Sequence, residues 1–166
     1  NYIFEKYKPR KVFHFAAESH VDRSIKNYRP FLESNVIGTI NLLNASLKAE
    51  IEKFHHISTD EVYGSLEYYD KILFSERTPY DPRNPYSASK AASDYFVKSW
   101  HNTYGLPYLI TNCSNNYGPH QHVEKLIPLV VSNALDNKIT YMHDGGEQIR
   151  DWIHVNDHCD AILTLD

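Results

Sequence analysis

The chain has 166 residues, of which 42% are hydrophobic and 23% charged, values that are typical of one globular domain and exclude wholesale disorder. Its formal net charge of −4, without a block of basic residues, argues against nucleic acid as a partner, and no apolar run approaches the roughly 18 residues that a membrane span needs. Its two cysteines, Cys113 and Cys159, have neither disulfide nor metal spacing, so we expect a soluble protein of the reducing cytoplasm without a bound metal.

Short apolar runs alternate with segments of helical periodicity in the first part of the chain. Residues 11–17 predict a strand buried on both faces. Residues 30–48 have apolar side chains at three- and four-residue spacing, which predicts an amphipathic helix. A second strand is predicted over residues 53–59, and a polar loop follows it.

The alternation continues in the second part. Pro85 favours the start of a helix that reaches Tyr104, because Gly105 is a typical helix stop. The remaining predicted elements are a strand at 106–114, a helix at 124–135, strands at 139–143 and 151–155, and a last helix capped by Asn156 or Asp157.

This order of elements predicts a doubly wound α/β fold with a parallel sheet, which is Rossmann-like. In such folds ligands bind beyond the carboxyl ends of the strands. The residues that follow the predicted strands are polar at 17–22, 58–64 and 112–118. We therefore look for the chemistry of the protein in these three segments.

Tyr86 and Lys90 lie one turn apart on the predicted helix that begins near Pro85. An ammonium group near a phenol favours the phenolate, so this pair can supply a base near neutral pH. The spacing alone is common, and an exposed helix turn with a solvated lysine explains it equally. The neighbouring motifs decide between the two interpretations.

Thr59, Asp60 and Glu61 directly follow the second predicted strand. The two carboxyl groups can serve one pocket only if the backbone leaves the β conformation after Thr59, since neighbouring side chains of a strand point to opposite faces. Gly64 is compatible with such a bend. Two carboxyl groups in different environments can act as a general acid and a general base. The alternative is a polar loop in which Asp60 caps a turn.

Other polar residues allow two interpretations each. Residues 16–24 fit either close contact with a flat ligand or a strand followed by a capped helix. Arg150 can bind an anion with two hydrogen bonds or pair with Asp151. The ten histidines lack a carboxylate or cysteine at usual metal-ligand spacing, so we expect no metal site.

The motifs, taken together and in order, resemble those of the extended short-chain dehydrogenase/reductase superfamily, and within it the dTDP-glucose 4,6-dehydratases. The strings that carry the resemblance are FAAESHVDRSI, STDEVYG, PYSASK, NCSNNYGPHQ, EKLIP and IRDWIHVNDH. The Tyr-x-x-x-Lys pattern is shared by the whole superfamily. Thr59-Asp60-Glu61 is the specific motif, because epimerases of this fold usually lack the paired carboxylates.

The resemblance implies NAD as the cofactor and a mechanism in which C4 of a nucleotide-linked glucose is oxidised, water is eliminated across C5 and C6, and C6 is reduced. Tyr86 would then be the base for the C4 hydroxyl, and Lys90 would lower its pKa and bind the nicotinamide ribose. Thr59 would bind the same sugar oxygen. Asp60 would protonate the departing C6 hydroxyl, and Glu61 would remove the C5 proton.

The resemblance also implies binding roles outside this catalytic set. It assigns NAD contacts to Ala16, Ala17, Glu18 and Asn116, and substrate contacts to Ser19, Asn115, Lys125, Leu126 and Arg150. It further implies a homodimer formed through the helices at 30–48 and 86–104, and a role in deoxysugar biosynthesis such as the rhamnose pathway.

Two departures from the family pattern stand out. The glycine-rich phosphate loop of the family is absent, and most of its substrate domain would follow Asp166, so the chain resembles an internal fragment that binds NAD weakly or not at all by itself. Residues 1–118 would be the remainder of the NAD-binding domain, and residues 119–166 the start of the nucleotide-sugar-binding region. His143 stands where we expect a tyrosine of the nucleotide pocket.

Three functions remain open from the sequence. The first is a dTDP-glucose 4,6-dehydratase. The second is a UDP-glucose 4,6-dehydratase or a nucleotide-sugar epimerase of the same fold. The third is a catalytically idle protein that binds NAD or a nucleotide sugar.

Overall fold

The computed structural model describes residues 2–66, 69, 73–141, 143–146 and 148–165. These residues form two compact units, Asn1–Asn112 and Cys113–Asp166. We describe each unit by itself. The predicted division after residue 118 concerns binding functions and remains a prediction.

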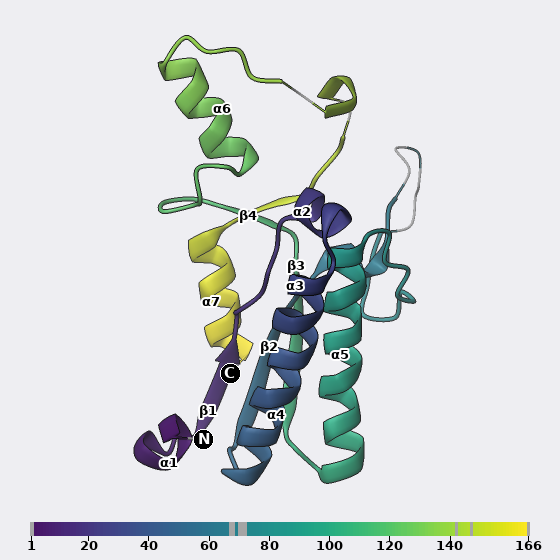
Figure 1. The fold of residues 1–166 in the computed structure, drawn as a ribbon, viewed down its shortest axis with the longest axis vertical. Helices are drawn as coiled ribbons and strands as arrows, with labels where there is room; N and C mark the ends of the chain where they lie inside the picture. Colours follow the sequence, from purple (N-terminus) through teal and green to yellow (C-terminus); the bar gives the residue numbers. More distant parts are fainter. Residues whose placement is uncertain (1, 67–68, 70–72, 142, 147, 166) are drawn as a thin grey trace. The chain divides into compact units, whose positions relative to one another are not determined.

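The first unit is a three-stranded sheet with helices packed on it (Figure 1). Strand β2 lies between β1 and β3, and β1 pairs with β2 in parallel, from Lys11 opposite Lys53 to His14 opposite His56. The elements in chain order are α1 (Tyr2–Tyr7), β1 (Lys11–His14), α2 (Val21–Lys26), α3 (Arg29–Phe31), the π-helix η1 (Leu32–Ile37), α4 (Gly38–Lys48), β2 (Lys53–Thr59), the 3-10 helix η2 (Asp60–Tyr63), α5 (Pro85–Tyr104) and β3 (Tyr108–Cys113).

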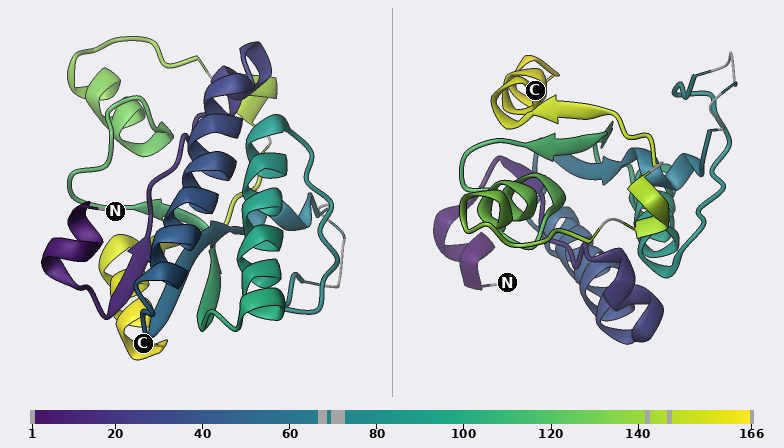
Figure 2. Two further views of the ribbon diagram at one scale, coloured as in Figure 1. Left: turned by 60° about the horizontal axis from the view of Figure 1, so that its bottom comes forward. Right: turned by 90° about the horizontal axis from the view of Figure 1, so that it is seen from above.

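Helices α4 and α5 lie side by side, and α5 contacts β2 (Figures 1 and 2). Their contact encloses the hydrophobic core of the unit, because apolar side chains of both helices meet those of β2 and the adjoining turns. The buried core residues are Leu43, Ile51, Phe54, Val97 and Leu106.

The boundaries of α5 follow from local sequence signals. Asn84 accepts a hydrogen bond from the backbone amide of Ser87 at 2.8 Å, and the Ser87 hydroxyl lies 3.2 Å from the backbone amide of Asn84, which together make a capping box. Pro85 occupies the first turn, and Gly105 ends the helix in the left-handed conformation at φ 76°. The predicted helix over residues 86–104 is therefore confirmed.

Several predicted elements of the first unit differ in extent. The helix predicted from residue 30 is present, but it includes the π-helical segment η1. The predicted strand at 11–17 ends at His14, and the expectation that it is buried on both faces is wrong. The physical reason is that Lys11 and Phe13, which share one face of this edge strand, are exposed, whereas His14 on the other face is buried.

The second unit contains a two-stranded parallel sheet and two longer helices (Figure 2). Helix α7 contacts both strands of this small sheet. The elements are β4 (Asn115–Tyr117), α6 (Leu126–Leu135), the 3-10 helix η3 (His143–Gly146), β5 (Trp152–His154) and α7 (Val155–Leu165). The α/β class and parallel pairing predicted from the sequence are confirmed, with the described strands divided between two sheets.

Three predictions for the second unit need correction. Residues 139–141 are not a strand, Met142 lies outside the described residues, and η3 begins at His143, so the strand predicted at 139–143 is wrong. Its β-branched and aromatic residues have strand propensity, which forms a strand only where a partner strand is available. Helix α7 begins at Val155, so neither Asn156 nor Asp157 is its cap. Helix α6 begins at Leu126, two residues after the predicted start.

Gly64 allows the chain to turn sharply after η2. Its φ of 99° lies in a region that side chains disfavour, and a Cβ atom built there would lie 2.8 Å from the carbonyl oxygen of Asp81. The backbone amide of Asp81 donates to the carbonyl of Val62 at 2.9 Å, which holds the returning loop against η2. The backbone contact therefore requires glycine at this position.

We expect Gly64→Ala to destabilise the complete protein more than Gly105→Ala. Gly105 also has positive φ, but nothing lies within 4 Å of the position that its Cβ atom would take, so its substitution costs only the conformational term, about 1 kcal/mol. At Gly64 the clash with a backbone atom should add about 1–3 kcal/mol. Urea denaturation of both variants measures the difference, and equal losses would contradict the close contact.

Candidate active site

The end of β2 presents the sequence Thr59-Asp60-Glu61 in a bent backbone. Thr59 is extended, with φ −141° and ψ 151°, and the 3-10 helix η2 begins at Asp60. The Thr59 hydroxyl accepts the backbone amide of Glu61 at 3.2 Å and donates to the Asp60 carboxylate at 3.2 Å. The backbone thus leaves the β conformation after Thr59, as two carboxyl groups serving one pocket require.

The carboxylate of Glu61 lies beside the start of α5. The side-chain amide of Asn84 donates to Glu61 Oε2 at 3.4 Å, while its oxygen caps the helix. One asparagine therefore joins the segment after β2 to the first turn of α5, which also contains Tyr86. Asp60 and Glu61 are both partly exposed residues.

Tyr86 and Lys90 are both buried on α5, with 8% and 4% of their surfaces exposed. The Lys90 ammonium donates to the carbonyl of Ile57 on β2 at 2.8 Å. The Tyr86 ring contacts Phe31 edge-on, with centroids 6.4 Å apart, and its backbone amide donates to the Ser24 hydroxyl. This burial excludes the solvated helix turn as an explanation of the Tyr-x-x-x-Lys pattern.

The loop after β1 contains four predicted contact residues, and all four are exposed: Ala16, Ala17, Glu18 and Ser19. Asn35 holds this loop, because its side-chain oxygen accepts the Glu18 amide at 2.8 Å and its nitrogen donates to the Glu18 carbonyl at 2.9 Å. The same nitrogen lies 2.9 Å from the Ser89 hydroxyl of α5. Small side chains on a fixed backbone fit close contact with a flat ligand such as a dinucleotide.

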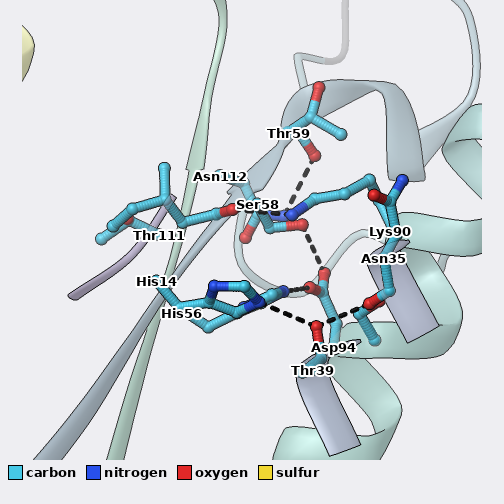
Figure 3. A network of polar contacts seen from close by, with 12 residues as sticks. His14, Asn35, Thr39, His56, Ser58, Thr59, Lys90, Asp94, Thr111 and Asn112 are labelled. Atoms are coloured by element: carbon cyan, nitrogen blue, oxygen red, sulfur yellow. Dashed lines mark hydrogen bonds and ion pairs between the residues drawn. The ribbon is translucent and has the colours of Figure 1, made fainter. Parts of the chain in front are cut away.

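A buried polar network surrounds Lys90 and Asp94 of α5 (Figure 3). Asp94 accepts hydrogen bonds from the hydroxyls of Ser58 at 2.7 Å and Tyr80 at 2.9 Å, and His56 Nε2 lies 3.2 Å from its other oxygen. On the neighbouring strand, His14 Nε2 lies 2.9 Å from the Thr39 hydroxyl. Polar side chains from both strands and both long helices thus pair inside the unit.

Burial disfavours the charged form of both histidines in this network. The pKa of His14 falls to about 3, mainly through burial and further through the nearby His56 and Lys90. Burial is also the largest cause that lowers the pKa of His56, against the opposing effect of the Asp94 carboxylate. Both imidazoles are therefore neutral at pH 7.

The second unit contains the other predicted contact residues. Asn116 lies in β4, where its side chain bonds His158 Nδ1 at 2.7 Å and the Ser114 carbonyl at 3.1 Å. Arg150 is exposed and bonds the Ile149 carbonyl. Asn115 begins β4, Lys125 precedes α6, and Leu126 is the first residue of α6 and is exposed. The side chain of His143 lies outside what the structure describes.

Sequence reasoning missed three residues that hold the site together: Asn35, Asn84 and Asp94. A signal existed for Asn84, since asparagine before Pro85 with Ser87 three residues on is a capping pattern. Asn35 and Asp94 lie inside predicted helices, where a polar residue normally faces solvent. Nothing local distinguishes them from solvent-facing residues.

Two other kinds of site are absent from the described residues. No group of three or more His, Cys, Asp or Glu side chains is arranged to hold a metal ion within the described ranges. None of the described helices is long and apolar enough to span a membrane.

Comparison with known proteins identifies the family of this chain. The family model described as GDP-mannose 4,6 dehydratase matches residues 1–165, and the chain belongs to this family. It is 51% identical over 179 aligned positions to dTDP-glucose 4,6-dehydratase 1 of Escherichia coli strain K12. The alignment covers 98% of this chain and 50% of that protein. The chain thus spans about half the length of the curated relatives it matches.

Solved structures show the same fold in related enzymes. The dTDP-glucose 4,6-dehydratase DesIV of Streptomyces venezuelae, solved with NAD bound, is 48% identical with a TM-score of 0.89, over 93% of this chain and 47% of that one. A UDP-glucose 4-epimerase of Thermotoga maritima, solved with UDP-glucose, is 28% identical with a TM-score of 0.90, over 98% of this chain and 53% of that one. The fold is therefore common to dehydratases and epimerases, and the site must distinguish them.

We expect the complete protein to lose stability as the pH falls below about 6.5, partly through His14. The unfolded chain binds a proton at His14 near pH 6.5 whereas the folded protein does so only near pH 3. Between these values His14 alone should cost up to about 1.4 kcal/mol per pH unit. Urea denaturation between pH 7 and 4 measures this slope. In His14→Gln the slope should decrease, and an unchanged slope would contradict a buried neutral His14.

Proposed function

We propose that the chain is part of an NAD-dependent dTDP-glucose 4,6-dehydratase, which converts dTDP-glucose to dTDP-4-keto-6-deoxyglucose and water. The observation that carries the proposal is the paired carboxylates Asp60 and Glu61 beside the helix that bears Tyr86 and Lys90. An epimerase of this fold has no use for an acid and a base at that position. The similarity to the E. coli enzyme supports the same choice.

The residues of the first unit fit NAD as the cofactor. Ala16, Ala17 and Glu18 form an exposed segment next to the helix of Lys90, in which the two alanines have small side chains and Asn35 fixes the backbone at Glu18. NAD, when bound, supplies the hydride acceptor for oxidation at C4 and the hydride donor for reduction at C6. Lys90 would bind the nicotinamide ribose, and Asn116 would also contact NAD.

The oxidation step uses the base on α5. Tyr86 removes the proton of the C4 hydroxyl, while the Lys90 ammonium favours the phenolate form of Tyr86. The Thr59 hydroxyl binds the same sugar oxygen. Because Lys90 is buried, its charge acts on Tyr86 with little screening by water.

The elimination step uses the two carboxyl groups. Oxidation at C4 acidifies the C5 proton, which Glu61 removes as general base. Asp60 protonates the departing C6 hydroxyl, and water leaves. The contact of Asn84 with Glu61 fixes this carboxylate, whereas Asp60 lies beside the Thr59 hydroxyl, so the two carboxyl groups have different environments.

Substrate contacts and assembly complete the proposal. Ser19, Asn115, Lys125, Leu126 and Arg150 bind the nucleotide sugar, with Lys125 and Arg150 toward its diphosphate. The complete protein is a homodimer of the cytoplasm in a deoxysugar pathway such as that of rhamnose. Exposed apolar side chains support the dimer surface on the two long helical segments: Leu32, Ile37, Tyr95 and Tyr104.

The complete protein, incubated with dTDP-glucose, should form a 4-keto-6-deoxy product that has lost one water. Mass spectrometry and the alkaline ultraviolet absorbance of the product measure this. Preference for UDP-glucose in the parallel reaction would keep the mechanism but change the substrate. A C4 epimer without loss of mass, or no reaction with either sugar, would reject the dehydratase.

Glu61→Gln should reduce dehydration by about 10²–10⁴-fold, because glutamine cannot remove the C5 proton. Oxidation at C4 precedes this step, so NADH absorbance should still appear in a single turnover. Glu76→Gln is the matched control, since Glu76 is an exposed residue of the loop after η2, and it should retain full activity. Unchanged turnover of Glu61→Gln would refute its role.

A further inference from the structure

Asp94 is a fully buried carboxylate with a role that the proposed mechanism leaves open. It is 0% exposed, and its Oδ2 accepts two hydrogen bonds, from Ser58 on β2 and from Tyr80 in the loop before α5. Hydroxyl donors stabilise the ionised form of a carboxyl group. An acidic side chain with two hydroxyl donors is therefore held in the interior of the first unit.

Lys90 lies one turn before Asp94 on the same helix and is almost as deeply buried. The two side chains attach to successive residues of β2. The Lys90 ammonium binds the Ile57 carbonyl at 2.8 Å, and Asp94 binds the Ser58 hydroxyl at 2.7 Å (Figure 3). Because a buried charge is costly without an opposite charge nearby, this arrangement places each charge where the other offsets its burial.

The other ionisable groups around Asp94 do not supply the balancing positive charge. His56 and His14 face it from β2 and β1, and burial lowers the pKa of each. Tyr80 and Tyr63 face it from the loop and η2. Burial, followed by the Asp94 charge, raises the pKa of both phenols, so they remain neutral. Lys98 also lies near the network, with its ammonium 4.8 Å from the centroid of the Tyr80 ring, but its side chain is only half-buried. Lys90 is the buried cation of this network.

We propose that Asp94 is a positioning residue whose buried carboxylate keeps the Lys90 ammonium protonated and fixed at the Ile57 carbonyl, one turn from Tyr86. The proposal rests on the function proposed above, in which the Lys90 ammonium favours the phenolate of Tyr86. Ser58 and Tyr80 keep the Asp94 carboxylate in place. Because the Tyr80 hydroxyl donates to Asp94, the loop that contains Tyr80 helps to position the carboxylate that acts on Lys90.

Asp94→Asn keeps the shape of the side chain and removes its charge, and its pH–rate profile in the complete protein tests the proposal. Loss of a buried negative charge lowers the pKa of every neighbouring group. The acid limb, set by Tyr86, and the alkaline limb, set by Lys90, should therefore both move to lower pH by about one unit.

Ser58→Ala is the matched control for this profile, because it removes one hydrogen bond to the same carboxylate and leaves the charge. It should lower the rate with both limbs in place. If Asp94→Asn also lowers the rate without moving either limb, Asp94 has only a structural role and the proposal is wrong.

A double-mutant cycle of stability tests the charge pair without any turnover. Asp94→Asn and Lys90→Met each leave one buried charge without its opposite, so the double variant should lose less stability in urea than the sum of the two single losses. Additive losses would overturn the proposal. If Asp94→Asn alone does not fold, the double variant should fold, and its failure would count equally against the proposal.

The two measurements also separate this proposal from the proposed function. Coupling between Asp94 and Lys90 in a complete protein that does not dehydrate dTDP-glucose would reject the proposed function and leave the charge pair supported. Turnover without coupling and without a shift of the pH profile would reject the role of Asp94 alone.

Discussion

The hydrogen bond from the buried Lys90 ammonium to the Ile57 carbonyl joins the start of α5 to the end of β2. The rest of the site depends on it. Thr59 follows Ile57 by two residues, and Tyr86 precedes Lys90 by one turn, so one contact brings the polar end of the strand and the phenol together. The capping of α5 by Asn84 adds a second connection at the same edge.

The interior that surrounds this contact is unusually polar. Ser87, Ser89 and Ser93 are buried on α5, and the Ser93 hydroxyl donates to the carbonyls of Asn35 and Ser89. Small side chains allow η1 and α4 to approach α5 closely, and each hydroxyl finds a backbone acceptor. The helix is therefore held by hydrogen bonds on one part of its surface and by apolar packing around Val97 on another.

Much of this arrangement follows from local sequence signals, and the remainder does not. Pro85 and Gly105 determine the ends of α5 through their own backbone preferences, so the helix was predictable. The bend after Thr59 was predictable as a condition, because Asp60 and Glu61 can serve one pocket only if the backbone leaves the β conformation there. Asp94 was not, because its burial depends on Ser58 and Tyr80, which are distant in sequence. The strand predicted at 139–143 was wrong because propensity does not supply a partner strand.

The π-helical segment η1 gives one extra residue per turn at the position of Asn35. The Asn35 carbonyl accepts hydrogen bonds from Thr39 and Ser93, while its side chain binds the loop at Glu18. Deleting one residue from η1 would close this wide turn to regular α-helical winding and displace Asn35 from at least one of these partners. The wide turn thus lets Asn35 contact both the loop after β1 and α5, and a change in the number of residues of η1 would disturb both connections.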